Sequence, residues 1–136
     1  MKALIRLVFF TLLLGYVSAF AQIGKQNKRE WILVDGENPV ANYYIDAGSV
    51  LSKNDLLRVF ILVDLKIKLE EGQSSFQELI FRCGPINKRL VRFSYFEYYS
   101  GKMLSGNILN GGVVNDESWT DLVGSLIPVA NFVCPK

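Results

Sequence analysis

Apolar and polar residues alternate along much of the chain, which is the pattern of half-buried β-strands. The longest such stretch, residues 56–69 (LLRVFILVDLKIKL), is rich in Val, Ile and Leu and has apolar residues on both faces. This predicts a strand in the centre of a sheet. Shorter strands are predicted at residues 30–34, 42–46, 75–83 and 88–100.

The stretch at residues 88–100 (KRLVRFSYFEYYS) is interpreted as one uninterrupted strand. Residues 106–116 then hold a final short strand or hairpin, in which Asn110-Gly111 is a turn signal. Strict alternation divides the side chains of the 88–100 strand between two faces: Val91, Phe93 and Tyr95 on one, and Arg92, Ser94 and Phe96 on the other.

In the last segment of the chain, apolar residues recur at the spacing of a helix rather than at that of a strand. From Leu126 to Val133, apolar residues recur at spacings of three, four and seven, which predicts a short helix. Ser125 is a candidate N-cap, and Pro128 falls in the first turn, where its missing N–H costs little. Because a lone helix of this length is unstable in water, it must pack on the sheet.

Residues 1–21 have the layout of a secretory signal peptide. Lys2 and Arg6 form a short basic region, and small residues at the end of the apolar run suit cleavage before Gln22. The apolar run is about 14 residues long, short of the roughly 20 needed to span a bilayer. No cysteine follows the cleavage site to carry a lipid. We therefore expect an exported protein, periplasmic or secreted, that is not lipid-anchored and has no membrane span after signal cleavage.

The two cysteines of the chain, Cys83 and Cys134, are expected to pair in an oxidising compartment. The bridge would close a loop of about 50 residues, for which the chain-entropy estimate is roughly 4 kcal/mol. Because Cys83 shares a strand face with Leu79 and Phe81, the bridge would clamp the terminal helix onto that face. The predicted fold is α+β: an antiparallel sheet of about six strands, with one C-terminal helix packed on one face and tethered by a disulfide.

Residues 22–30 (QIGKQNKRE) are polar and aperiodic, which predicts a flexible lead-in to one domain at residues 31–136. The whole chain carries 15 basic and 13 acidic residues, and removing residues 1–21 leaves 13 of each. A neutral protein lacks long-range attraction to polyanions, which argues against nucleic acid as a partner.

The chain contains no histidine, which excludes Ser-His-Asp and Cys-His catalytic sets. No phosphate-binding loop, metal site or cofactor is predicted. Asp46, Asp64 and Glu78 could supply a carboxylate pair for acid–base chemistry. The simpler interpretation is that they solvate strand ends and exposed faces, so we predict that the protein is not an enzyme.

Aromatic residues are frequent on the predicted strands. They either fill the core and pair across strands, or form a tyrosine-rich contact surface for another protein. Phe60, Leu62 and Phe96 are expected on the sheet face opposite the helix. The binding surface predicted from the sequence comprises Tyr44, Phe60, Leu62, Arg92, Phe96 and Tyr98.

Several features follow one another in a distinctive order. Trp31 opens the domain, and YYID is followed by Ser49 and the RVFILVDL strand. Glu78 and Cys83 mark an E-x-x-x-x-C strand end before the basic KRLVRF strand with its tyrosine pair. The end of the chain holds Trp119, a Gly-Ser pair at residues 124–125 and a terminal cysteine. In this order and in the two cysteine positions, the chain resembles the surface-adhesin protein E family of Gram-negative bacteria.

The resemblance implies a six-stranded antiparallel sheet whose C-terminal helix is disulfide-tethered to the concave face. It also implies binding to host extracellular-matrix proteins and the ability to dimerise. The predicted function is thus a non-enzymatic exported binding module that recognises a protein partner, either a host matrix protein or a second copy of the chain. The alternatives are a small periplasmic hydrolase using carboxylates, and a periplasmic structural or stress protein of unassigned role.

The signal-peptide interpretation predicts that the exported protein begins at Gln22, with no attached lipid, because cleavage follows the small residues at 19 and 21. N-terminal sequencing and intact-mass measurement of the exported protein would check this. A retained signal or an acyl adduct would contradict it.

Overall fold

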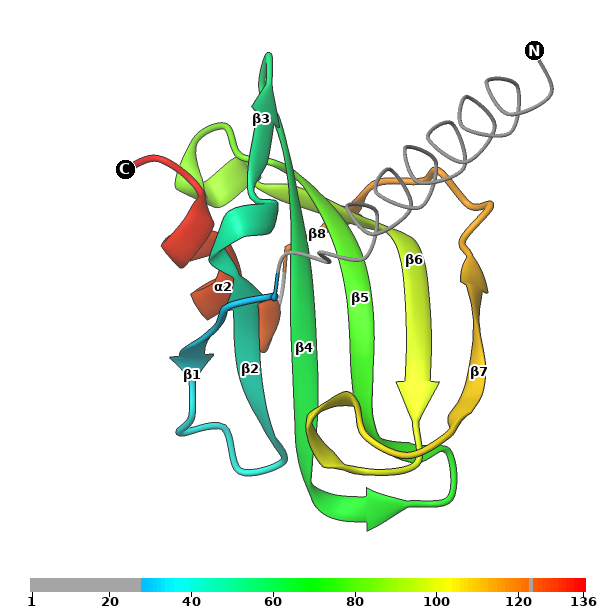
Figure 1. The fold of residues 1–136 in the computed structure, drawn as a ribbon. Helices are drawn as coiled ribbons and strands as arrows, with labels where there is room; N and C mark the ends of the chain where they lie inside the picture. Colours follow the sequence, from blue (N-terminus) through cyan, green and yellow to red (C-terminus); the bar gives the residue numbers. More distant parts are fainter. Residues whose placement is uncertain (1–27, 123) are drawn as a thin grey trace, which may run out of the picture.

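The computed structural model describes residues 28–122 and 124–136. The predicted signal peptide and most of the lead-in lie outside this part of the chain. The described residues form one antiparallel sheet and one α-helix (Figure 1). The strands are β1 (Trp31–Asp35), β2 (Ala41–Asp46), β3 (Leu51–Lys53), β4 (Leu56–Leu69), β5 (Gly72–Arg82), β6 (Leu90–Tyr99), β7 (Ile108–Val113) and β8 (Thr120–Asp121).

Six strands run across the sheet in the order β1-β2-β4-β5-β6-β7. The predicted six-stranded sheet is therefore confirmed, and β4 lies at its centre as expected. Two short strands extend it, since β3 pairs with β4 and β8 pairs with β6. The central pair, β4 and β5, is in register from Leu56 opposite Arg82 to Asp64 opposite Ser74.

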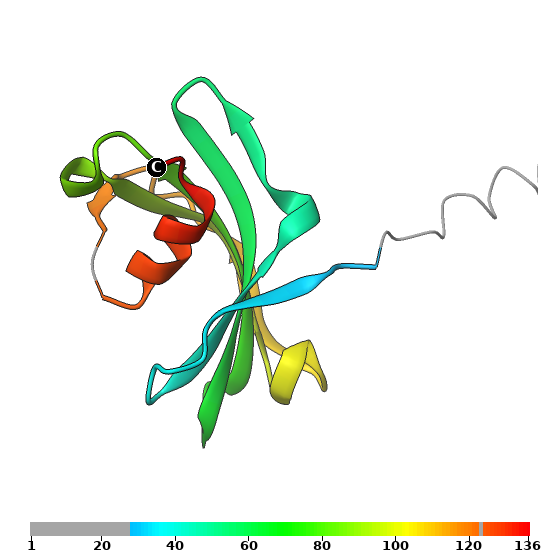
Figure 2. The same ribbon diagram turned by 90° about the vertical axis from the view of Figure 1, so that its left-hand side faces the viewer.

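The helix α2 (Leu126–Val133) has the predicted bounds and covers one face of the sheet, called here the helix-side face (Figure 2). Its Val129 and Ala130 are fully buried. Burial of apolar side chains at about 25 cal/mol per Å² is the main force holding the layers together. The sheet residues beneath the helix alternate along their strands as predicted: Ile45, Val59, Ile61, Leu79, Phe81 and Val91.

Two polar contacts and one covalent bond fix the helix to the sheet. Cys83 and Cys134 form the predicted disulfide, with their Cα atoms 5.5 Å apart. At the same end, buried Arg89 donates from Nη1 to Asn131 Oδ1 at 2.7 Å. Ser125, at the other end, is the candidate N-cap, but its side chain makes no capping hydrogen bond to the helix. Its Oγ instead accepts a hydrogen bond from Tyr43 Oη at 2.8 Å.

The opposite face of the sheet, called here the far face, is partly covered by the β6–β7 connection, which contains the 3-10 turn η3 (Lys102–Leu104) (Figure 2). Asp64 accepts from Met103 N at 2.8 Å, and Ser74 Oγ accepts from Leu104 N at 2.9 Å. These bonds satisfy backbone groups that would otherwise be unpaired against the sheet.

Two further 3-10 turns, η1 (Ala47–Ser49) and η2 (Ile86–Lys88), complete the described elements. The expectation of a turn at Asn110-Gly111 is wrong, because both residues lie inside β7 and pair with Tyr98 and Glu97 of β6. A side chain at position 111 would meet Phe96 O at 2.9 Å, so glycine is needed for close strand approach there rather than for a turn.

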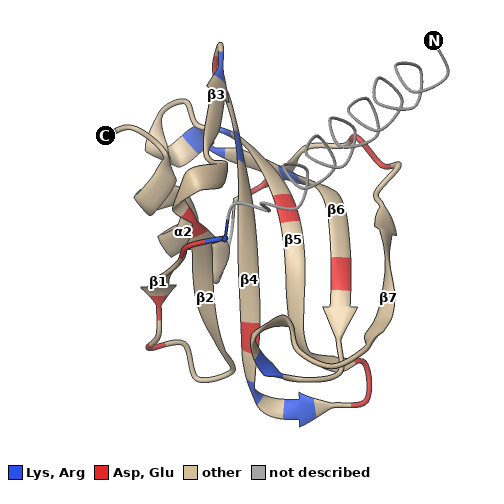
Figure 3. Ribbon diagram, in the orientation of Figure 1, with Lys and Arg blue, Asp and Glu red and all other residues tan. Residues whose placement is uncertain are grey.

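Basic and acidic residues are dispersed along the strands and connections of the described part of the chain (Figure 3). This agrees with the near balance of 15 basic and 13 acidic residues in the sequence. None of the helices in the described part has the length and apolarity needed to cross a membrane.

The disulfide should be what keeps α2 on the sheet. Cys134→Ser is expected to lower the free energy of unfolding by up to about 4 kcal/mol, because the closed loop is lost from the unfolded chain. Hydrogen exchange should show the amides of residues 124–136 losing protection before those of β4 and β5. Cys83→Ser is the matched control and should behave identically; unchanged protection in both variants would contradict this account.

Candidate binding site

The structure divides the six residues predicted as a binding surface between the two faces of the sheet. Phe60 and Leu62 lie on the far face, as expected, and Tyr44 and Arg92 lie there with them. Phe96 and Tyr98 lie on the helix-side face, since they pair with Gln77 and Ser75. Directly paired residues of an antiparallel sheet share a face. The expectation that Phe96 accompanies Phe60 and Leu62 is therefore wrong.

A β-bulge in β6 explains this error. Phe93 pairs with Leu79 and Tyr95 pairs with Glu78, so Ser94 is an extra residue without a partner on β5. One extra residue shifts every later side chain to the other face. Ser94 is held in place by its Oγ, which donates to Glu78 Oε1 at 2.8 Å. Tyr95, Glu97 and Tyr99 thus lie on the far face, and Phe96 and Tyr98 on the helix-side face.

Two residues of the predicted surface are already engaged within the fold. Leu62 is 0% exposed and cannot contact a partner. The Arg92 guanidinium lies 4.8 Å from the ring centroid of Trp119, and the Arg82 guanidinium lies 4.6 Å from the same centroid. The Trp119 ring therefore attracts both guanidinium groups by cation–π interaction. Tyr44 and Phe60 are half-buried.

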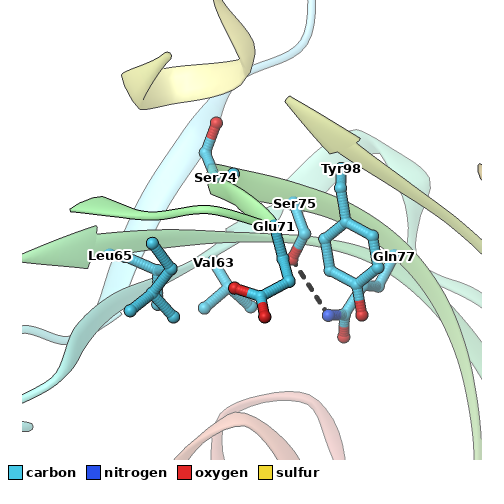
Figure 4. A pocket seen from close by; sticks show the side chains of 9 residues that line it. Val63, Leu65, Glu71, Ser74, Ser75, Gln77 and Tyr98 are labelled. Carbon is cyan, nitrogen blue, oxygen red and sulfur yellow. Dashed lines mark hydrogen bonds between the residues drawn. The ribbon is translucent and has the colours of Figure 1, made fainter. Parts of the chain in front are cut away.

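The helix α2 covers only part of the helix-side face and leaves a hollow of about 400 Å³ beside it. Side chains of Val63 and Leu65 form an apolar surface there, and the Tyr98 ring lies at one side (Figure 4). Gln77 Nε2 donates to Ser75 Oγ at 3.0 Å within the hollow (Figure 4). Glu71 also extends its carboxylate into it from the β4–β5 turn, whereas Ser74 points to the other face (Figure 4).

The aromatic surface continues from the hollow toward the sheet edge. The Phe96 and Tyr98 ring centroids are 5.3 Å apart. Their partners on β7 are Gly112 and Asn110, and Gly112 has no side chain to cover the Phe96 ring from that side. Tyr98 is 37% exposed and Phe93 is 38% exposed. We define the helix-side aromatic surface as Val63, Leu65, Phe93, Phe96 and Tyr98.

The three carboxylates considered for acid–base chemistry have separate structural partners. Asp46 and Asp64 are buried, which corrects the expectation that they solvate exposed faces. Asp46 Oδ1 accepts from Gly48 N at 3.1 Å and Asp64 Oδ1 from Met103 N at 2.8 Å, so both hold turns against the sheet. Glu78 binds the bulge residue Ser94.

In the part of the chain that the structure describes, no three His, Cys, Asp or Glu side chains are grouped to hold a metal ion.

The family comparison agrees with this architecture. The model of surface-adhesin protein E matches residues 31–134, which is almost the whole described domain. The chain belongs to the surface-adhesin protein E family. A comparison with curated proteins finds no match. Membership of the surface-adhesin protein E family implies a surface adhesin and favours a non-catalytic role in protein binding. Together with the disulfide, it also indicates an exported protein.

This member of the surface-adhesin protein E family also carries a cluster that was not predicted from the sequence. On the far face, Glu97 accepts hydrogen bonds from the hydroxyls of Tyr95 and Tyr99, one on each carboxylate oxygen. These two hydrogen bonds, together with the positive charge of Arg29, lower the pKa of Glu97. The hydrogen bond to Glu97 is the main cause of the raised pKa of Tyr95. Burial, followed by the bond to Glu97, raises the pKa of Tyr99 to about 12.

Strict alternation along β6 places Tyr95, Glu97 and Tyr99 together, but on the helix-side face, away from Phe60 and Phe76. The two tyrosines lie two residues to either side of Glu97 along β6. This spacing is the one signal that could have identified the cluster, because residues two apart on a strand share a face.

Alkaline titration should show Tyr99 ionising at about pH 12, later than a tyrosine at the ordinary value of 10.0. Because the folded pKa is raised, the stability that Tyr99 contributes is present below pH 10 and is lost as the pH rises through about 12. Glu97→Gln should lower the Tyr99 pKa, since it removes the carboxylate acceptor and its charge. Tyrosinate ultraviolet absorbance is the measurement.

Glu78→Gln is the matched control for this titration, because Glu78 binds Ser94 rather than a tyrosine. It should leave the tyrosine titration unchanged. Equal effects of the Glu78 and Glu97 substitutions would show that the contacts of Glu97 with the two tyrosines do not raise the pKa of Tyr99.

Proposed function

We propose that this protein is an exported, non-enzymatic adhesin module that binds a protein partner through the helix-side aromatic surface. The observation that carries the proposal is the half-covered sheet face. Helix α2 is only eight residues long, and beside it the hollow and the exposed rings of Phe93 and Tyr98 remain accessible. Membership of the surface-adhesin protein E family supplies the functional class.

The chemistry of this surface suits a protein partner. Aromatic residues are enriched at protein interfaces because they offer a large contact area with few torsions to order. Gln77 and Ser75 add hydrogen-bonding groups at the floor of the hollow, and Glu71 adds one negative charge at its edge. An apolar centre with few polar groups around it is the arrangement typical of interface hot spots.

The carboxylates give no comparable support to a hydrolase. Acid–base catalysis needs two groups that converge on one reacting atom. Asp46, Asp64 and Glu78 instead hold a turn, a loop and a bulge at three different places in the fold. A host matrix protein and a second copy of the chain are both candidate partners, and direct binding experiments separate them.

The proposal predicts which face controls binding. The protein would be tested by biolayer interferometry against a panel of purified host matrix proteins, and against itself by sedimentation. For the partner that binds, Tyr98→Ala is expected to weaken the affinity about tenfold or more, because truncation of a hot-spot aromatic typically costs about 2 kcal/mol or more. Phe96→Ala should act in the same direction.

Tyr44→Ala is the matched control, because Tyr44 is a half-buried tyrosine on the far face. It should leave the affinity unchanged. If Tyr44→Ala weakens binding as much as Tyr98→Ala with both variants folded, the helix-side aromatic surface is not the site.

A further inference from the structure

A second aromatic cluster lies on the far face, away from the surface proposed above. Phe76 is its centre and is 5% exposed. Its ring centroid lies 5.2 Å from that of Phe60, 6.2 Å from that of Tyr95 and 6.5 Å from that of Trp31. Four strands therefore contribute to one cluster, because these residues come from β1, β4, β5 and β6. We define the far-face cage as Trp31, Phe60, Phe76, Tyr95, Glu97 and Tyr99.

The far-face cage holds a cation supplied by the chain itself. The guanidinium carbon of Arg29 lies 4.4 Å from the Phe76 ring centroid and 5.5 Å from the Phe60 centroid. Both distances are within the roughly 6 Å range over which aromatic rings attract cations. The backbone next to Arg29 is fixed by a hydrogen bond from Ala47 N to Glu30 O at 3.3 Å. The end of the segment expected to be a flexible lead-in is therefore seated on the sheet.

The charge of the far-face cage is set by Glu97. Its carboxylate receives one tyrosine hydroxyl on each oxygen, and a carboxylate can accept about four hydrogen bonds in all. Capacity for further donors therefore remains. The two tyrosine donors also favour the ionised carboxylate, so the cage is negative at neutral pH. A planar cation with several N–H donors fits stacked rings beside such a carboxylate better than a compact ammonium does.

Arg29 lies on the cage without being locked into the core. The residue is exposed, although the Phe76 ring below it is buried. Arg29 also precedes β1, so its side chain can leave the cage without breaking a strand pair. This is the behaviour expected of an internal ligand that covers a site and can be exchanged.

We propose that the far-face cage recognises the guanidinium group of an arginine side chain, with Arg29 as its internal occupant and an arginine of a protein partner as the ligand that replaces it. The inference rests on the proposed function only in taking the partner to be a protein. It uses the opposite face of the sheet, so the two proposals can fail separately.

The test removes the internal occupant and supplies the ligand chemistry as a small molecule. N-acetyl-arginine amide would be titrated into wild type and Arg29→Ala, with backbone amide NMR shifts as the readout. Arg29→Ala should bind it several-fold to about tenfold more tightly, because wild-type Arg29 competes at an effective concentration in the millimolar range. The shifts should centre on amides near Phe60, Phe76 and Glu97.

Three controls make the result specific. Arg29→Ala combined with Glu97→Gln should lose most of the binding. N-acetyl-lysine amide should bind Arg29→Ala more weakly than the arginine compound does. Arg82→Ala should bind no better than wild type, because it removes a cation–π contact from Trp119 and leaves the far-face cage covered.

Arg29→Gln provides a second emptied cage that keeps the aliphatic stem over the rings, should Arg29→Ala lower stability. Its amide spectrum would establish that the fold is intact. The proposal is overturned if the folded variants show no saturable shifts, or if the shifts lie away from the cage. Equal affinity for the lysine compound would also overturn it, since that reports general attraction to negative charge.

Discussion

The covalent bond between Cys83 and Cys134 is the constraint on which the arrangement of this protein depends. An isolated eight-residue helix has no stability in water, and α2 contributes few fully buried side chains of its own, chiefly Val129 and Ala130. The bridge fixes the end of the helix to the end of β5, and the Arg89–Asn131 hydrogen bond aligns it there. A very short helix can therefore cover the apolar core beneath it.

The shortness of that element has a functional consequence. A longer helix would cover the helix-side face from β1 to β6. Helix α2 leaves the hollow beside Val63, Leu65 and Tyr98 accessible. The disulfide offsets part of the missing apolar burial, because it reduces the entropy of the unfolded chain. Exposed aromatic area usually reduces solubility. Retaining it on a stapled domain is consistent with the adhesin role that family membership implies.

Most of the fold could be predicted from the sequence because its signals were local. Alternation along residues 56–69 identified the central strand, and the spacing of apolar residues identified helix α2. The far-face cage could not be predicted, because a single bulge at Ser94 changes the face of every later residue on β6. Arg29 was missed for a related reason, since its partners lie on strands distant in sequence and its own segment shows no periodicity.

The bulge also determines which face of the sheet receives each set of β6 side chains. Without the bulge, Tyr95, Glu97 and Tyr99 would lie on the same face as Phe93, and Phe96 and Tyr98 would lie on the far face. With it, Phe96 and Tyr98 supply apolar area to one face, and Glu97 with its tyrosines supplies a negative charge to the other. With 15 basic and 13 acidic residues, the chain has little long-range electrostatic attraction to guide a partner. Recognition must therefore depend on short-range contacts, and one irregular strand provides two distinct kinds of them on opposite sides of the sheet.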